Sequence, residues 1–466
     1  MARVSRALNR LRSGRLLRGA TGTLAIKVVS NGLMFLISVV LARLLGASDF
    51  GIYALVLTWV GLLTVVGNLG LERLAIREVA AFEARSEWGF LRGFLRRANQ
   101  AVLAVSLLLA TGAALILVWR AGVVDPRLVA GFLVGMLLVP INTLGQLRES
   151  ALRGLHHVVK AQVPGTLLRP GLLLVCVGLV HWTAPARIGV ASVLGLGVLS
   201  GLVALAVYVW LLGRHLPRAA RQAPPTYRTR QWAKSALPML VVAAMFVVNY
   251  SSGVAVLGFF ADSEAVGVFR IAFRLAEFMN LAAFALAAPL APMISSLYAT
   301  GQLDTLQRTI TRAARVVFAV GAAVGAGLVV FGSPLLSLFG KEFVQGYPVL
   351  VILCFGRLAV LLFGPVVFVA VMTRNERLAA VWVSIGAAAT IGFSLALIPI
   401  WGTTGAATAT ASAQILWMGC LAVLVWRRIG INSTVPGRPH GRLRAPATGG
   451  VSREPDESAL DTTRIP

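Results

Sequence analysis

Charged residues are scarce in this chain of 466 residues, and acidic residues are the scarcest of them. Only 13% of the residues are charged, with 17 acidic against 43 basic side chains, whereas 58% are hydrophobic. A soluble globular protein usually has about a quarter of its residues charged. The composition therefore excludes an ordinary soluble protein and predicts a protein that lies mostly within a membrane.

The chain also has few residues of the types that support redox, metal or nucleotide chemistry. It contains 3 cysteines without a CxxC spacing and 5 histidines without a HExxH pattern, so neither a disulfide framework nor a metal site is expected. It contains no GxxxxGK[ST] phosphate-binding loop, so ATP hydrolysis by this chain is not expected. We therefore expect no metal, no cofactor and no catalytic residue.

Long hydrophobic runs make up most of what is present. They cover residues 21–43, 50–71, 98–119, 128–147, 164–183, 188–213, 235–259, 265–298, 316–334, 347–372, 378–399 and 404–426. A bilayer core of about 30 Å requires roughly 20 apolar residues in a helix. The sequence thus predicts an all-α integral membrane protein with about twelve transmembrane helices.

Basic residues are concentrated in every second gap between these runs, beginning with the segment before residue 21 and ending with the tail after residue 427. By the positive-inside rule, this alternation predicts a multi-pass protein of the cell (inner) membrane with both termini cytoplasmic. The net charge of +26 is spread over separate segments that lack an aromatic stacking platform. We therefore expect contacts with anionic membrane lipids and no nucleic-acid partner.

The two halves of the chain show a weak internal repeat. A shift of 216 positions places Gly51-Ile52-Tyr53 over Gly267-Val268-Phe269, at the start of the second run of each half. An even number of spans per half leaves both halves in the same orientation, which predicts a parallel pseudo-repeat of two six-helix lobes around a central cavity. The predicted segments are a basic cytoplasmic N-terminus (1–20), an N-lobe (21–213), a cytoplasmic linker (214–234), a C-lobe (235–427) and a disordered cytoplasmic tail (428–466).

Polar side chains inside the spans are the candidates for function, because a charge within the bilayer is costly and usually faces a protein interior or an aqueous cavity. Two runs carry such residues at helical spacing, which places them on one face of each helix. They are Lys27, Asn31 and Ser38 in the first run, and Arg270, Arg274, Glu277 and Asn280 in the eighth. Arg357 in the tenth run is a further candidate without a polar stripe of its own.

Each of these charges also has an alternative interpretation. Lys27 and Arg270 lie near the ends of their runs and can extend to the membrane surface. Arg274 and Glu277 lie about 13 and 18 Å from the start of their run, near the middle of the bilayer, and can simply form an ion pair at i, i+3. We favour a cavity role for this pair.

Several segments resemble the polysaccharide or O-antigen flippases of the multidrug/oligosaccharidyl-lipid/polysaccharide exporter superfamily. The residues that carry the resemblance are Leu41-Ala42-Arg43-Leu44-Leu45-Gly46-Ala47-Ser48-Asp49-Phe50-Gly51-Ile52-Tyr53-Ala54, Asn68-Leu69-Gly70-Leu71 with Arg77-Glu78, Glu264-Ala265-Val266-Gly267-Val268-Phe269, and Ala287-Ala288-Pro289-Leu290-Ala291-Pro292. The first segment is the most specific, and the resemblance covers about residues 15–427.

The resemblance implies a V-shaped bundle whose central cavity is lined mainly by the first, second, seventh and eighth spans. It further implies a flippase that moves a polyprenyl-diphosphate-linked oligosaccharide to the external leaflet by alternating access. Arginine suits a diphosphate because its guanidinium pairs well with phosphate oxygens. On this basis Asn249 and Ser252 of the seventh span become candidates for hydrogen bonds to sugar. Polysaccharide assembly enzymes are further expected partners.

Other functions remain as alternatives. Another exporter of the same superfamily, either a peptidoglycan-precursor flippase or a drug antiporter, is the first of these. The first span carries Lys27 and no carboxylate, which favours the flippase branch over a cation-coupled antiporter. A membrane glycan polymerase or ligase would need a sizeable external loop with catalytic residues. The gaps on the predicted external side are too short for one, so we expect a transporter and no enzyme. A purely structural membrane protein is the last alternative.

Overall fold

The computed structural model describes residues 2–120, 122, 125–184, 188–373 and 375–437, and the regular elements within them are helices. In the first half they are α1 (Ala2–Gly67), α2 (Leu71–Ala84), α3 (Trp88–Trp119), α4 (Pro126–Met136), α5 (Leu138–Gly154), α6 (Val158–Val163), the π-helix η1 (Pro164–Leu168), α7 (Arg169–Thr183) and α8 (Val190–His215). The linker holds α9 (Arg218–Gln222).

The second half begins with a long helix and includes two 3₁₀ turns. Its elements are α10 (Thr229–Phe260), α11 (Ser263–Ala276), the 3₁₀ turn η3 (Glu277–Asn280), α12 (Leu281–Ala299), α13 (Leu303–Val330), α14 (Gly332–Ser337), the 3₁₀ turn η4 (Lys341–Gly346), α15 (Tyr347–Leu362), α16 (Val366–Met372) and α17 (Glu376–Ile429). Because α10 starts at residue 229, the last part of the predicted linker is already helical.

Nine helical segments among the described residues are long and apolar enough to span a membrane. Two of these segments, α1 and α17, each consist of two helices joined at a sharp bend. The bends lie at Gly46 and at Gly402, and both glycines have positive φ. A side chain would strain the backbone at such positions. The remaining span is divided into α11, η3 and α12. The prediction of an all-helical protein with about twelve spans is thereby confirmed.

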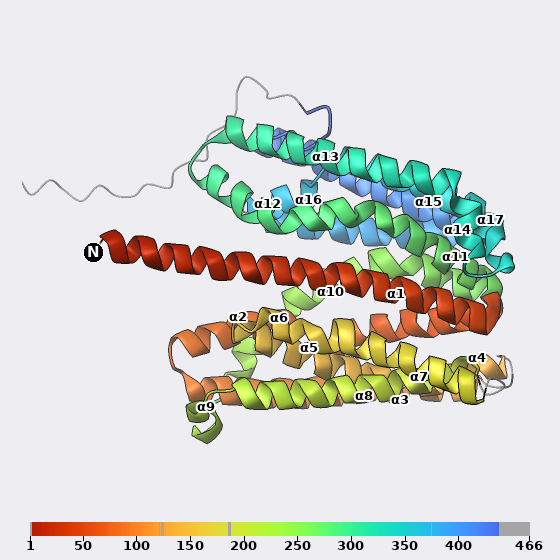
Figure 1. The fold of residues 1–466 in the computed structure, drawn as a ribbon, viewed down its shortest axis with the longest axis horizontal. Helices are drawn as coiled ribbons and strands as arrows, with labels where there is room; N and C mark the ends of the chain where they lie inside the picture. The colour runs from red at the N-terminus through yellow and green to blue at the C-terminus, as the bar shows by residue number, and fades with distance from the viewer. Residues whose placement is uncertain (1, 121, 123–124, 185–187, 374, 438–466) are drawn as a thin grey trace, which may run out of the picture.

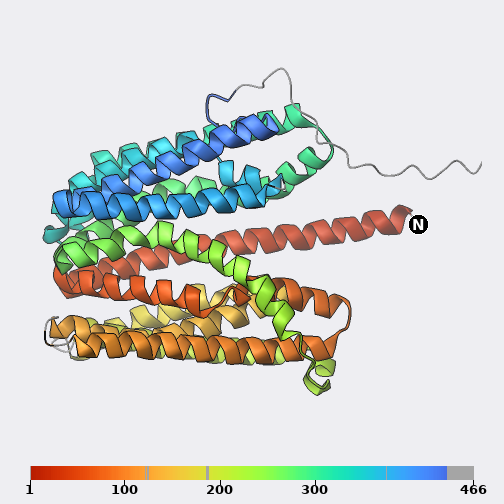
Figure 2. The same ribbon diagram turned by 180° about the vertical axis from the view of Figure 1, so that it is seen from behind.

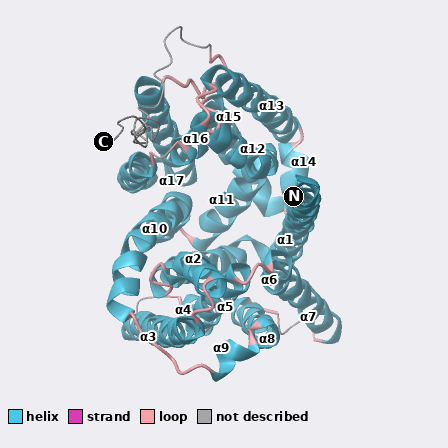
Figure 3. Ribbon diagram, turned by 90° about the vertical axis from the view of Figure 1, so that its left-hand side faces the viewer, coloured by secondary structure: helices cyan, strands magenta, loops and turns pink. Residues whose placement is uncertain are grey.

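The helices form two groups on either side of α1. Figure 1 shows α2–α9 on one side of α1 and α11–α17 on the other, and Figure 3 shows the same two groups end-on. Helix α10 crosses between them (Figure 2). Its first turns bury Trp232 and Ala236 in an apolar cluster with first-lobe residues, whereas Leu257 near its end is buried in a cluster with second-lobe residues. This helix therefore ties the two lobes together.

The lobes meet most closely at the two glycines that the internal repeat makes equivalent. A Cβ atom at Gly51 would lie 1.6 Å from the carbonyl oxygen of Ser263, and one at Gly267 would lie 2.3 Å from that of Ala47. Only glycine allows the backbones to approach this far. The pseudo-symmetric contact brings the start of α11 against the second part of α1.

The C-terminal segment after α17 differs from the sequence prediction of disorder from residue 428. Ile431 and Ser433 are buried, and the backbone N–H of Val435 donates a hydrogen bond to the carbonyl of Leu362 at 2.9 Å. Gln307 of α13 bonds both backbone groups of Asn432. These contacts hold the chain on the second lobe through residue 437. The rest of the predicted tail, 438–466, lies outside the described residues.

Candidate functional site

Arg274 and Glu277 lie where α11 gives way to the 3₁₀ turn η3. Arg274 Nη1 is 3.3 Å from Glu277 Oε2, and the two side chains are 24% and 18% exposed. The i, i+3 ion pair considered from the sequence is therefore present. A 3₁₀ turn within a span often marks a functional hinge. Here the turn interrupts the α-helix at Glu277, directly after the last turn of α11.

Two further polar side chains reach the same carboxylate region from other helices. The hydroxyl of Tyr250, on α10, donates a hydrogen bond to Glu277 Oε1. Arg357, on α15, donates from Nη1 to Gln414 Oε1 at 2.9 Å, and it interacts electrostatically with Glu277 and Tyr250. We call Tyr250, Arg274, Glu277, Arg357 and Gln414 the Glu277 cluster. Arg357 had no polar stripe to support it in the sequence, yet the fold joins it to the pair.

The polar stripe of the first span lies next to this cluster. Phe35 of α1 packs edge-on against Phe278 of η3, with ring centroids 5.6 Å apart. Helical periodicity places Phe35 on the same face as Asn31 and Ser38. The stripe of the first span and the break in the eighth span thus face each other between the lobes, as the resemblance implies.

The remaining predicted residues have looser or different surroundings. Lys27 is exposed and Asn31 is partly exposed on α1. Arg270 is partly buried on α11 and lies within electrostatic range of Tyr53 and Tyr250. Asn280, at the end of η3, is partly exposed and makes no side-chain cap for α12.

Asn249 has a structural role that the sequence did not indicate. Its amide donates to the carbonyls of Met245 and Val383, at 3.0 and 2.9 Å, and its carbonyl accepts from Thr390 at 3.2 Å. These bonds use both amide hydrogens and join α10 to α17 inside the second lobe. The predicted role of Asn249 in binding sugar is therefore not supported by its contacts. Ser252 is buried one turn later without a hydrogen bond.

A polar pocket inside the first lobe escaped the sequence analysis. It has a volume of about 200 Å³ and is bordered by α5, η1, α7 and α8. Within it Tyr208 donates to Glu149 Oε2 at 3.1 Å, and Arg153 pairs with the other carboxylate oxygen. Arg169 donates to Asn142 Oδ1 at 2.6 Å. We call this the Glu149 pocket. The i, i+4 spacing of Glu149 and Arg153 is typical of an ion pair on a helix. Both residues, however, lie beyond the predicted span 128–147, in the gap before the next span.

A second carboxylate lies close to this pocket, at the start of α2. Burial raises the pKa of Glu72, and the negative charge of Glu149 raises it further, against the opposing effect of Arg73 and Arg153. The first lobe therefore does contain partly buried acidic groups, although its first span has none.

Polar contacts also join the lobes where α1 bends. The backbone N–H of Ala47, freed by the bend at Gly46, donates to Glu342 Oε2 at 2.8 Å, so this carboxylate caps the second part of α1. Arg43 Nε donates to the carbonyl of Leu338 at 2.6 Å. The segment that carried the family resemblance, residues 41–54, is thus an interlobe contact.

The arrangement favours binding of an anion between the lobes. Two guanidinium groups, those of Arg274 and Arg357, interact with the single carboxylate of Glu277, and a third, that of Arg270, interacts with Tyr250. Such groups form strong bidentate hydrogen bonds with phosphate. Within the described residues, no three His, Cys, Asp or Glu side chains are grouped as metal ligands would be.

Comparison with known proteins shows the family of the chain. The family model for "polysaccharide biosynthesis protein" matches residues 16–298. The probable flippase AglR of Haloferax volcanii is 30% identical over 170 residues, which cover 34% of this chain and 34% of that protein. This match thus spans about a third of the relative's length.

Two solved structures show the same fold at low sequence identity. An inward-facing multidrug resistance MATE family transporter of the MOP superfamily has a TM-score of 0.69 at 15% identity, covering 86% of this chain and 94% of its own. The lipid II flippase MurJ, in an inward closed conformation, has a TM-score of 0.67 at 14% identity and covers 86% of each chain. Because the family model matches more than half of its residues, the chain belongs to the polysaccharide biosynthesis protein family, with the two-lobe fold of the multidrug/oligosaccharidyl-lipid/polysaccharide exporter superfamily.

Proposed function

We propose that this protein is a flippase that moves a polyprenyl-diphosphate-linked oligosaccharide from the cytoplasmic to the external leaflet of the cell membrane. The two lobes, residues 21–213 and 235–427, would rock about their contact to give alternating access, with both termini cytoplasmic. The product would serve surface polysaccharide biosynthesis, such as O-antigen for lipopolysaccharide. Polysaccharide assembly enzymes would act before and after this step.

The Glu277 cluster is the observation that carries the proposal. It gathers an excess of guanidinium groups at a break in a span, between the lobes, where a diphosphate would pass. A cationic lining is favourable for a diphosphate and unfavourable for the cationic compounds that many drug exporters carry. Asn31 and Ser38 of the polar stripe of α1 add neutral hydrogen-bonding groups beside it, and Lys27 adds a further positive charge.

The proposal is tested by locating the lipid-linked glycan in cells that lack this protein. A membrane-impermeant probe that labels glycan separates the two leaflets. We expect the finished unit to accumulate in the cytoplasmic leaflet and to return to the external leaflet when the gene is restored. Accumulation in the external leaflet would place the missing step downstream and would exclude translocation as the function.

One observation favours a second candidate, a cation-coupled exporter of another substrate. The Glu149 pocket places a carboxylate inside the first lobe, which weakens the argument drawn from the first span alone. Purified protein in vesicles distinguishes the two candidates. Export of a cationic dye driven by a proton or sodium gradient would favour the antiporter, whereas transfer of the lipid-linked glycan favours the flippase.

A further inference from the structure

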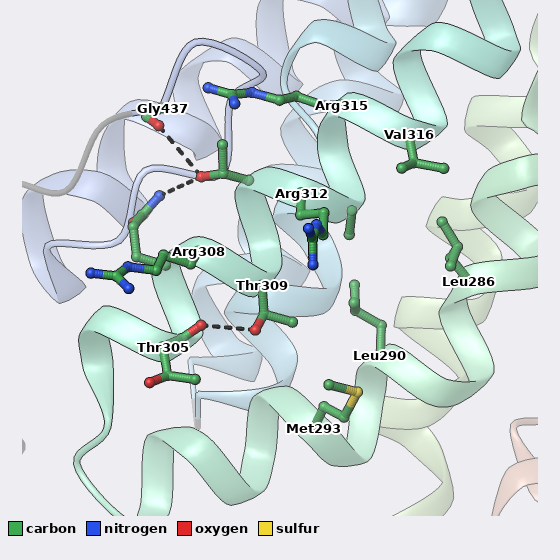
Figure 4. Close-up of a pocket in the computed structure, with 13 residues that line it drawn as sticks. Leu286, Leu290, Met293, Thr305, Arg308, Thr309, Arg312, Arg315, Val316 and Gly437 are labelled. Atoms are coloured by element: carbon green, nitrogen blue, oxygen red, sulfur yellow. Dashed lines mark hydrogen bonds between the residues drawn. The ribbon is translucent and has the colours of Figure 1, made fainter.

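A wide groove lies outside the Glu277 cluster, between α12 and the first half of α13. Its volume is about 1000 Å³. One wall is apolar and is formed by Leu286, Leu290 and Met293 of α12, whereas the other carries Arg308, Arg312 and Arg315 of α13. Figure 4 shows Arg312 between the two walls, with Arg308 and Arg315 extending toward one side. The groove is therefore amphipathic across its width.

Among the described residues, the cationic wall lacks compensating acidic groups. The arginines follow each other at spacings of four and three residues, which places them along one face of α13. No carboxylate lines the groove among the described residues, and Arg308 and Arg312 form no ion pair there. Arg315 donates only to the backbone carbonyl of Val435, at 3.3 Å. The wall thus presents unneutralised positive charge to whatever occupies the groove.

The position of the groove along the span indicates a membrane-embedded ligand. Arg308 to Arg315 precede the apolar run of α13, which begins at residue 316, so they lie at the level of the lipid headgroups. The apolar wall of α12 continues from there toward the middle of the span. An amphiphile with an anionic head and a long hydrocarbon chain fits both walls at once.

The number of arginines in the groove distinguishes two kinds of anionic amphiphile, an acidic phospholipid and a diphosphate-linked carrier. An ordinary acidic phospholipid offers a single phosphodiester, whereas a diphosphate-linked carrier offers two adjacent phosphoryl groups. Neighbouring guanidiniums on one helix face, about 5–6 Å apart at Cβ, can bind both groups together. Three uncompensated arginines therefore match the diphosphate better.

We propose that this groove is a docking site for the polyprenyl diphosphate carrier, occupied before the carrier reaches the Glu277 cluster. This inference rests on the proposed function. Helix α12 connects the two sites directly, because Leu286 follows Glu277 by nine residues, about 14 Å along the helix. The diphosphate would bind Arg308 and Arg312 first and then move along α12 toward Arg274.

Binding of polyprenyl diphosphate to the full-length protein in detergent, measured by native mass spectrometry, tests the proposal. The wild-type protein should bind the probe at two sites. Arg308→Gln combined with Arg312→Gln should weaken one of them about tenfold, as expected for loss of charged hydrogen bonds. Arg274→Ala should remove the other. The conservative variant Arg312→Lys should retain most of the binding.

A matched control is available at the end of α17. Arg427→Gln combined with Arg428→Gln removes the same charge from exposed positions outside the groove, and this variant should bind normally. If phosphatidylglycerol binds as tightly as the diphosphate and competes with it, the assignment to the carrier is wrong. If the groove variant binds like the wild type while Arg274→Ala loses binding, the groove is excluded and the proposed function stands. Loss of neither site would count against both.

Discussion

Each lobe contains a tyrosine, a glutamate and an arginine joined in the same way, yet in different surroundings. In the first lobe, Tyr208 and Arg153 hold Glu149 beside a small pocket enclosed by helices of that lobe. In the second lobe, Tyr250 and Arg274 hold Glu277 at a break in a span that faces the other lobe. Tyr250 is 39% exposed, whereas Tyr208 is 4% exposed.

We infer from this difference that the location of the Tyr–Glu–Arg set, within a lobe or at the interlobe face, determines its role. A carboxylate held inside one lobe should contribute to the rigidity of that lobe, because both of its partners belong to the same lobe. A carboxylate braced at the interlobe face holds its arginine where a ligand can compete for it. We therefore expect changes in the first lobe to affect stability and changes in the second to affect transport.

The largest expected effect comes from the contact that both lobes share. Gly51→Ala and Gly267→Ala each place a methyl group within 2.3 Å of a backbone oxygen of the other lobe. The lobes can then no longer approach each other at this contact. Export of surface glycan should be abolished in both variants and the protein should also become less stable, since overpacked contacts are strongly unfavourable.

Gly61→Ala provides the control on the same helix, because a Cβ there meets no heavy atom within 4 Å. It should export normally. Unequal effects of the two interface variants would contradict the pseudo-symmetric contact.

Replacement of the arginine in each Tyr–Glu–Arg set should separate a role in stability from a role in transport. Arg274→Ala should abolish export while the protein is still inserted in the membrane, because the diphosphate loses a charged partner. Arg153→Ala should lower the free energy of unfolding by about 1–3 kcal/mol, because Glu149 loses a charged hydrogen bond, yet export per folded molecule should persist. Glycan labelling and membrane quantification measure export and insertion, and denaturant unfolding of the purified protein measures the change in stability. The interpretation fails if the two variants have the same phenotype.

Removal of one hydroxyl from each Tyr–Glu–Arg set should have a smaller effect in the same direction. Tyr208→Phe should cost about 1 kcal/mol of stability, the usual value of one hydrogen bond, seen as a lower thermal unfolding temperature. Tyr250→Phe should leave that temperature nearly unchanged and weaken binding of polyprenyl diphosphate a few-fold. If Tyr208→Phe weakened binding of polyprenyl diphosphate and left thermal stability unchanged, the assignment of stability to the first lobe and transport to the second would be wrong.

The smallest expected effect concerns pH and should be confined to the first lobe. Burial lowers the pKa of His157, and the positive charges of His215, Lys160 and His156 lower it further. Below a pH of about 6.5, the ordinary histidine pKa, the unfolded chain takes up a proton that folded His157 resists. Stability should therefore fall slightly as the pH drops through this range, because His157 is largely open to solvent and its charge interactions are screened.

Thermal unfolding between neutral and mildly acidic pH measures this loss, and His157→Gln should reduce it. His181→Gln changes an exposed histidine of the same lobe and should leave the pH dependence as it is. An unchanged slope in His157→Gln would assign the effect to other groups.

The sequence was sufficient for the fold and for part of the site. Hydropathy and helical spacing depend on neighbouring residues, so they predicted the spans and the Arg274–Glu277 pair. The hydrogen-bond partners of Asn249 could not be predicted because Val383 and Thr390 lie 134 and 141 positions away. Glu342 was missed for the same reason, since Ala47 is 295 positions distant. Glu149 was overlooked because a polar stretch at the end of a span resembles a loop.

The contact between Gly51 and Gly267 also fixes where the proposed rocking of the lobes would have its pivot. Because no side chains separate the two backbones, the lobes would rotate at this end with little sliding. Over a bilayer core of about 30 Å, a rotation of roughly 20° would displace the opposite ends by about 10 Å. Under the proposed function, a pair of glycines would thus convert a small local rearrangement into an opening wide enough for a sugar.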